Sequence, residues 1–299
     1  MKEYYYEYEN LAITVVKQVN KKRVMSLLII LLIVLLCLFL FVFSVYKKMD
    51  EIKNDTMHVE ETNIQENEEV EEKQPEIRLP ILTEQGRENV ANIYNSEQKI
   101  AYLTFDDGPS EKVTPQILSI LEQYGIKATF FVLGRNVDRY PDVVKQAYDK
   151  GHYIANHSYS HEYSIIYSNA QSLLDEYIRT EQSIRNAIGV QDYFCNLFRF
   201  PGGSMGKKYR KVKDEAIQLL SDNNILYVDW NALNNDSVGK PTAESLVNDL
   251  KTTVGTKNSV VILMHDTGSK QLTVDTLPQV LDYLIQQGYT FKNFYDVIM

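Results

Sequence analysis

The chain has 299 residues, of which 44% are hydrophobic and 24% charged, an ordinary globular composition with room for one barrel-sized domain or two small ones. Its net charge is −9, and much of the acidity lies between Asp50 and Glu76, where 11 acidic residues accompany two lysines. From Glu97 onward, 24 acidic and 20 basic residues leave a net charge of −4 without a basic stripe, which excludes a typical nucleic-acid-binding protein.

The first predicted element is a membrane helix. Leu27–Val45 contains 19 residues and no charge, enough to cross roughly 30 Å of hydrocarbon. A signal peptide or a buried core helix is the alternative, but the run is long for a signal and no small-residue cleavage site follows it. We therefore predict a tail over 1–24 and a transmembrane helix over 25–46.

The charges that flank this segment predict its orientation. Lys17 and the basic run Lys21–Arg23 precede the helix, whereas acidic residues dominate after Lys48. The excess of basic residues on the cytoplasmic side of membrane helices places the N-terminus in the cytoplasm. We expect a single-pass protein of the cell membrane that contacts the lipid bilayer through this helix and has its remaining domains outside the cytoplasm.

After an acidic, solvated linker over 47–96, we predict one folded domain over 97–299. Strand-like and helix-like segments alternate through it, which predicts an α/β fold with a parallel sheet, and about seven βα units favour a (β/α) barrel. The expected strands are Ile100–Phe105, Ala128–Leu133, His152–Asn156, Leu197–Phe200, Ile225–Asp229, Ser259–Met264 and one near Phe291. The expected helices are Val113–Tyr124, Asp142–Asp149, Ala170–Ile188, Lys208–Ser221, Ala243–Thr253 and Leu277–Gln287.

Polar clusters follow four of these strands. In a parallel barrel the C-terminal ends of the strands share one rim, so distant clusters can converge on one pocket. The clusters are TFDDGP at Thr104–Pro109, HSYSH at His157–His161, RFPGG at Arg199–Gly203 and LMHD at Leu263–Asp266.

The second cluster carries the metal-ligating pattern. His157 and His161 are four residues apart, which on a helix would place both imidazoles on one face. Two surface histidines are the commoner explanation of the spacing alone. However, four of the five histidines fall near the predicted rim, and among them His152 is expected to be structural because it precedes its strand.

The carboxylate pair Asp106-Asp107 supplies what the histidines lack. In extended backbone the two side chains would point to opposite sides, so one could bind a metal and the other act as a base. A simple Asp-Gly-Pro turn is the alternative. Two histidines and one carboxylate leave open positions on a zinc-like ion for water and substrate. With Asp106 to take a proton and His265 to give one, the pattern indicates hydrolysis of an amide or ester.

The four motifs, in this order, resemble those of the polysaccharide deacetylase family, carbohydrate esterase family four, which shares the NodB homology domain. The resemblance covers roughly Glu97–Met299 and implies a distorted (β/α) barrel. It implies a divalent metal, expected to be Zn²⁺, on a triad from two motifs. The residue roles that the resemblance implies are metal ligation by Asp107, His157 and His161, general base Asp106, and general acid His265.

The same resemblance implies supporting roles. Arg199 would orient Asp106 and lower its pKa. The backbone N–H of Gly202 would stabilise the oxyanion. Leu263 would line the pocket for the acetyl methyl group. Asp236 would be the partner of His265.

One departure from the family pattern concerns the acetyl groove. Ser237 stands where the family usually has a tryptophan, and Trp230, the only tryptophan, is either a substrate-site or a core residue. This puts the shape of the groove in doubt. The basic cluster Lys207–Lys213 is compatible with contact to an anionic wall polymer or with a solvated helix face.

The resemblance implies a polysaccharide N-deacetylase, a hydrolase of carbon–nitrogen bonds in linear amides, acting on a cell-envelope glycan. N-acetylglucosamine of peptidoglycan is the expected substrate. Three alternatives remain: an acetyl-ester hydrolase on a plant-type or wall glycan, a catalytically silent glycan-binding envelope protein, and a purely structural envelope protein.

Overall fold

A computed structural model describes residues 21, 25, 36, 39–44, 46–48 and 79–299. The chain divides into two compact units, Met1–Glu72 and Lys73–Met299. In the first unit, 39–44 and 46–48 are helical and exposed. Among the described residues, the structure contains no helix that combines the length and the apolar character needed to span a bilayer. Most of the predicted transmembrane segment, 25–46, lies outside the described residues.

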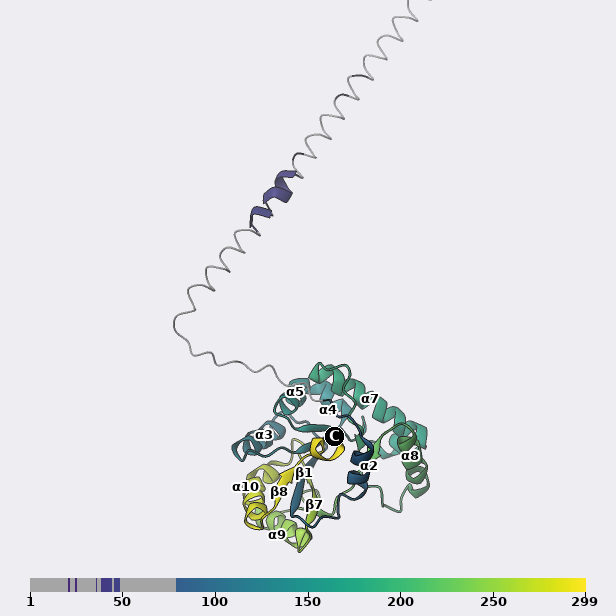
Figure 1. The fold of residues 1–299 in the computed structure, drawn as a ribbon, viewed down its shortest axis with the longest axis vertical. Helices are drawn as coiled ribbons and strands as arrows, with labels where there is room; N and C mark the ends of the chain where they lie inside the picture. Colours follow the sequence, from purple (N-terminus) through teal and green to yellow (C-terminus); the bar gives the residue numbers. More distant parts are fainter. Residues whose placement is uncertain (1–20, 22–24, 26–35, 37–38, 45, 49–78) are drawn as a thin grey trace, which may run out of the picture. The chain divides into compact units, whose positions relative to one another are not determined.

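The second unit is built on a parallel sheet of eight strands, which confirms the predicted α/β class (Figure 1). Its order is β5-β4-β3-β2-β1-β7-β6. Strand β8 pairs with residues 100–102 of β1, on the same edge of β1 that pairs with β2 at residues 104–106. The strands are β1 Ile100–Asp106, β2 Thr129–Val132, β3 Tyr153–Asn156, β4 Leu197–Phe198, β5 Leu226–Tyr227, β6 Ala232–Leu233, β7 Ser259–His265 and β8 Thr290–Lys292.

The two ends of the sheet, β5 and β6, are successive parts of one segment. Its first part pairs with β4 and its second part pairs with β7. Between them, the amide of Val228 still donates to Phe198 and that of Asn231 already donates to Val261. The strand ladder therefore returns on itself through Leu226–Leu233, consistent with a distorted (β/α) barrel that is irregular at this point.

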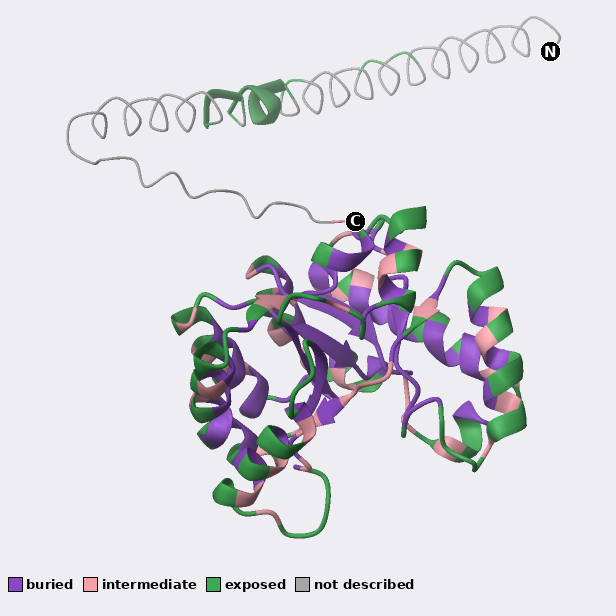
Figure 2. Ribbon diagram, turned by 60° about the horizontal axis from the view of Figure 1, so that its bottom comes forward, coloured by how far each residue is buried: buried purple, intermediate pink, exposed green. Residues whose placement is uncertain are grey.

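Helices surround the strands, and they turn buried faces inward and exposed faces outward (Figure 2). The strands β1, β2, β3 and β4 are buried throughout, as expected for a sheet covered on both sides. The helices are α2 Glu84–Ala91, α3 Val113–Gln123, α4 Gly134–Arg139, α5 Pro141–Asp149, α6 Tyr163–Ile166, α7 Ala170–Ile188, α8 Arg210–Asp222, α9 Ala243–Val254, α10 Gln271–Gln286 and α11 Tyr295–Ile298.

Helix α2 closes the end of the barrel where the strands begin. It is capped by Thr83, whose hydroxyl accepts from Gly86 and donates to the carbonyl of Ile298 in α11. A Cβ at Gly86 would clash with the backbone of Ile298, so glycine permits this close packing. Just after α2, the carbonyl of Ile93 accepts from Ser259 at the start of β7. Residues 79–96, predicted as part of the linker, thus include a helix anchored to the C-terminus.

Candidate active site

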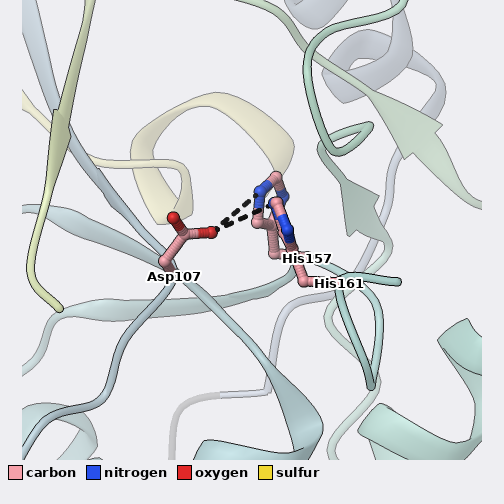
Figure 3. Close-up of side chains that lie close together, drawn as sticks. All are labelled: Asp107, His157 and His161. Carbon is pink, nitrogen blue, oxygen red and sulfur yellow. Dashed lines mark ion pairs between the residues drawn. The ribbon is translucent and has the colours of Figure 1, made fainter. Parts of the chain in front are cut away.

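Two of the predicted motifs, TFDDGP and HSYSH, bring three ligand atoms together at the C-terminal ends of β1 and β3 (Figure 3). The Oδ1 atom of Asp107 lies 3.5 Å from His157 Nε2 and 3.4 Å from His161 Nε2, and all three ligand atoms lie within 4.8 Å of one another. This Oδ1 is buried and has no hydrogen-bond donor. A carboxylate and two imidazoles around an unsatisfied oxygen form a donor set that fits a tetrahedral divalent cation.

His157 is held in the form that binds metals. Its Nδ1 lies 2.8 Å from the carbonyl of Arg199, which makes Nδ1 the protonated nitrogen and leaves Nε2 facing Asp107. Burial lowers the pKa of His157 to about 3, so the ring is neutral. The structure thus supplies both the tautomer and the charge state of a ligand.

The segment His157–His161 is a loop and not a helix, so helical spacing does not explain how the two imidazoles meet. Ser158 and His161 adopt left-handed backbone conformations, with φ of 74° and 57°, and these turn both imidazoles toward Asp107. The loop is tied down by Glu176 of α7, whose Oε2 accepts from the amides of Tyr159 and Ser160 at 3.0 and 2.7 Å. Short polar residues that compete for local hydrogen bonds explain why the sequence HSYSH leaves the helix.

Asp106 and Asp107 lie on the same side of the chain, against the expectation of opposite sides. Strand β1 ends at Asp106, and Asp107 has φ of 72°, a left-handed turn that rotates its side chain back toward the histidines. As a result, His157 Nε2 lies 3.5 Å from Asp107 and 3.8 Å from Asp106 Oδ2. The candidate base therefore adjoins the candidate metal site directly.

Arg199, which directly follows β4, positions Asp106. Its guanidinium donates to Asp106 Oδ1 at 2.8 Å and to Thr104 Oγ1 at 2.6 Å, and it stacks 4.0 Å from the ring centre of Phe131. Arg199 was expected to hold the pKa of Asp106 low. Instead, burial raises the pKa of Asp106 more than Arg199 lowers it, because the carboxyl is almost completely removed from water.

His265 ends β7, and Asp236 holds it in place. His265 Nδ1 lies 2.6 Å from Asp236 Oδ1, while Thr273 donates to Asp236 Oδ2 at 2.8 Å. Burial alone would lower the pKa of His265, but the hydrogen bond and the charge of Asp236 outweigh it and raise the pKa. The predicted pairing of Asp236 with His265 is present in the structure.

The RFPGG loop presents an unengaged amide at Gly202. Among the described residues 79–299, no acceptor is found for the N–H of Gly202, whose φ is 74°. The peptide unit that carries this N–H is fixed from its other end, because Tyr167 donates to the carbonyl of Pro201 at 2.7 Å. A Cβ at Gly202 would lie 2.5 Å from Tyr163 Oη, so glycine is needed for both space and conformation.

Trp230 lies behind this loop. A Cβ on Gly203 would lie 3.1 Å from its ring, and the ring centre is 5.8 Å from the guanidinium carbon of Arg199. Trp230 also lines a cavity of about 560 Å³ with Tyr94 and Tyr227, and none of the three metal ligands lines that cavity. Leu263 is buried in β7 beside β6, and Ser237 is exposed.

The basic cluster Lys207–Lys213 separates into different roles. Arg210 pairs with Asp214 along α8, as expected for a solvated helix face. Lys213, by contrast, is buried and donates to the carbonyl of Gly203, so it supports the RFPGG loop. His152, the histidine expected to be structural, is fully buried, and its Nδ1 accepts from the amide of Ala128.

Residues 94–217 match the family model for polysaccharide deacetylase. A peptidoglycan-N-acetylglucosamine deacetylase of Bacillus cereus is 34% identical over 205 residues, which cover 67% of this chain and 71% of that protein. The chain belongs to the polysaccharide deacetylase family. The family and the enzyme class predicted from the four motifs, that of the polysaccharide N-deacetylases, are thereby confirmed.

Two further relatives show the breadth of this deacetylase family. A bifunctional xylanase/deacetylase of Pseudobutyrivibrio xylanivorans is 34% identical over 208 residues, or 69% of this chain and 31% of that protein. The solved structure of a Streptococcus mutans CE4 esterase superposes with a TM-score of 0.63 at 32% identity, covering 69% of this chain and 90% of that one. The esterase therefore shares this fold.

Several residues that shape the deacetylase site belong to no recognisable sequence motif. Glu176, Tyr167 and Lys213 lie on or beside helices, at positions that a hydrophobic pattern assigns to a buried or solvated face. They form hydrogen bonds with backbone groups of the HSYSH and RFPGG loops. Such a bond does not depend on the residue type that supplies the backbone group, so no sequence motif records it. The one available signal is a charged residue at a helix position that faces the core.

Proposed function

We propose that this chain removes N-acetyl groups from the N-acetylglucosamine of peptidoglycan, using a divalent cation, most simply Zn²⁺, held by Asp107, His157 and His161. The observation that carries the proposal is the placement of the three ligand atoms within 4.8 Å of one another, with Asp106 on one flank. His265 lies next to Asp106, because the two residues pair in register across β1 and β7. The names of the relatives in Bacillus cereus and other bacteria support the choice of glycan.

When bound, the cation would acidify a water molecule and polarise the acetyl carbonyl. Asp106 accepts the proton of the attacking water, and its raised pKa makes it a stronger base than an exposed carboxylate. The N–H of Gly202 donates to the oxygen that gains negative charge. His265 donates its proton to the departing amine, and Asp236 stabilises the charged imidazole until then. Acetate and a free amino sugar are the products.

The proposal extends to location. The uncharged run Leu27–Val45 supports a membrane anchor with its N-terminus in the cytoplasm, and the acidic stretch after it supports a solvated tether. A catalytic domain outside the cytoplasm would meet the wall polymer there. Protease protection of a C-terminal tag in intact cells tests this, and protection of the tag from added protease would contradict it.

The catalytic proposal is tested by acetate release from N-acetylglucosamine oligomers and from purified peptidoglycan. We expect activity that a chelator removes and that zinc restores. Asp106→Asn should reduce kcat by about 100- to 10,000-fold, the usual contribution of a positioned base, without changing the amount of metal bound. Unchanged kcat in this variant would overturn the role of Asp106, and metal-independent acetate release would overturn the role of the triad.

A second candidate is hydrolysis of acetyl esters, since the same residues can attack an ester carbonyl. The match to a CE4 esterase and to a xylanase/deacetylase favours testing it. Acetylated xylan and acetylated peptidoglycan offered at equal acetyl concentration should separate the candidates through kcat/KM. A higher value on xylan would replace the peptidoglycan assignment.

A further inference from the structure

A second cavity opens beside the proposed catalytic site and has no role in the chemistry described above. Its volume is about 310 Å³. It is bounded by the loops that follow β1 and β7 and by helix α4, which follows β2, so it shares the rim that carries the catalytic residues. The lining residues are Pro109, Ser110, Glu111, Lys112, Asn136, Arg139, Tyr140, Thr267 and Gly268.

This cavity adjoins both halves of the catalytic machinery. The side chain of Asn136 donates to the backbone carbonyl of the metal ligand Asp107 at 2.8 Å. Thr267 and Gly268 follow the acid His265 by two and three residues. A glycan whose acetamido group reaches the three metal ligands would therefore extend a neighbouring sugar along this part of the rim.

The cavity carries two cations without carboxylate partners. Among the described residues 79–299, neither Lys112 nor Arg139 takes part in any of the ion pairs, although both side chains are exposed. The guanidinium of Arg139 lies 5.2 Å from the ring centre of Tyr140, which restricts its movement. Glu111 is the one acidic residue in the lining, so the cavity has a net positive charge.

These two cations line one cavity in a chain of net charge −9. A lysine and a planar guanidinium that have no acidic partner form a pair that can bind carboxylates. An unsubstituted N-acetylglucosamine polymer has no carboxylate to offer. A peptidoglycan strand carries one on the lactyl ether of each alternate sugar, or at the end of the peptide attached there.

We propose that this cavity is a binding site for a carboxylate on the glycan next to the sugar that is deacetylated, and that Lys112 and Arg139 contact it. The inference rests on the proposed function and narrows its substrate class to carboxylate-bearing glycans. It assigns substrate selection to a part of the rim that the metal and the acid–base residues do not occupy.

The test compares Lys112→Gln, Arg139→Gln and the double variant with the wild type, using the full-length chain in detergent with zinc supplied. Lys211→Gln is the matched control, because it removes one positive charge from an exposed side chain outside the cavity. The substrates are the neutral N-acetylglucosamine tetramer, a peptide-free peptidoglycan tetrasaccharide, the same tetrasaccharide with its carboxylates converted to methyl amides, and a peptide-bearing fragment.

We expect KM on the peptide-free tetrasaccharide to rise about fivefold in each single variant and about twentyfold in the double variant, with kcat unchanged. The neutral tetramer, the methyl amide and the Lys211→Gln control should show no rise. A rise confined to the peptide-bearing fragment would also support the site and would assign the carboxylate to the peptide. An unchanged KM on both carboxylate substrates, or an equal rise on the neutral tetramer, would overturn the inference.

Calorimetric titration of the same oligosaccharides separates this inference from the function on which it rests. Wild-type protein that binds the carboxylate tetrasaccharide more tightly than its methyl amide, and loses that preference in the double variant, supports the cavity whether or not acetate is released. Absence of acetate release from every substrate would contradict the proposed function alone. Equal affinity for the acid and its amide would contradict the cavity alone.

Discussion

Beside the metal ligands, the buried cation Arg199 holds the carboxylate of Asp106, and on the neighbouring strand the buried carboxylate of Asp236 holds His265. In both pairs the pKa of the catalytic group rises, but for opposite reasons. Burial raises the pKa of Asp106 against the pull of Arg199, whereas Asp236 raises the pKa of His265 against the effect of burial. A base gains strength and an acid keeps its proton to higher pH, so the same direction serves both roles.

The comparison teaches that the two partners differ in what they supply. Arg199 is fully buried and bonds Asp106, Thr104 and two backbone carbonyls, so it is part of the core as well as of the site. Asp236 bonds mainly the group that it serves, together with Thr273. Loss of Arg199 should therefore damage folding and catalysis together, while loss of Asp236 should mainly change the pKa of His265.

The largest expected effect is that of Arg199→Met. Removing the guanidinium leaves Asp106 buried without its partner, so we expect a loss of about 3–5 kcal/mol in the free energy of unfolding. Catalysis should fall by about 100- to 10,000-fold with it. Urea unfolding and acetate release measure the two effects. Arg199→Lys keeps the charge but loses the planar guanidinium, so its stability and activity should lie between those of the wild type and of Arg199→Met. A fully stable Arg199→Met variant would contradict this account.

Asp236→Asn should act on the pH profile of kcat. With the carboxylate charge gone, burial dominates, and burial lowers the pKa of an imidazole. His265 would then lose its proton at lower pH, so the alkaline limb of the profile should move to lower pH and kcat at the optimum should drop by about 100-fold. Asp229→Asn, which alters a carboxylate bonded to Ser204, should leave the position of the limb unchanged. A limb that stays in place in Asp236→Asn would show that His265 is not the group titrating there.

Glu176→Ala should weaken the metal site without touching a ligand. The change frees the amides of Tyr159 and Ser160, so the loop that carries His157 and His161 loses its anchor. We expect metal affinity to fall by about 10- to 100-fold, the range seen when groups that orient ligands are removed. Competition with a chromophoric chelator measures it. Asp175→Asn, an exposed neighbour on the same helix, should bind metal as the wild type does, and equal affinity in Glu176→Ala would remove the role of the anchor.

The smallest effect is expected for Tyr167→Phe. This variant keeps the ring but removes the donor to the carbonyl of Pro201, which orients the peptide unit carrying the Gly202 N–H. A less fixed oxyanion donor should lower kcat by about tenfold with KM unchanged, less than complete loss of such a donor. Tyr227→Phe is the control, because its hydroxyl bonds nothing among the described residues 79–299. A rise in KM alone would point to a binding role for Tyr167 instead.

The sequence predicted the parts of the fold and site that lie in contiguous motifs. The expected helix Ala170–Ile188 has the observed bounds, and the metal ligands, the base and the acid come from short motifs after strands. Periodicity could not find β6, since two residues carry no pattern, nor α2, whose burial depends on contact with α11. Nor could the sequence show how the HSYSH loop is held, because the acceptor of its amides, Glu176, lies 16 residues from Ser160 and outside every motif.

The packing of α2 against α11 has a consequence for shortened versions of the protein. The folded unit begins before Thr83, upstream of the first strand. A version that starts near Glu97 would lack α2, which shields Ile298, and would expose apolar side chains at this end of the barrel. Residues 79–83 also join the barrel at this end, where the strands begin, whereas the metal ligands follow the other ends of β1 and β3.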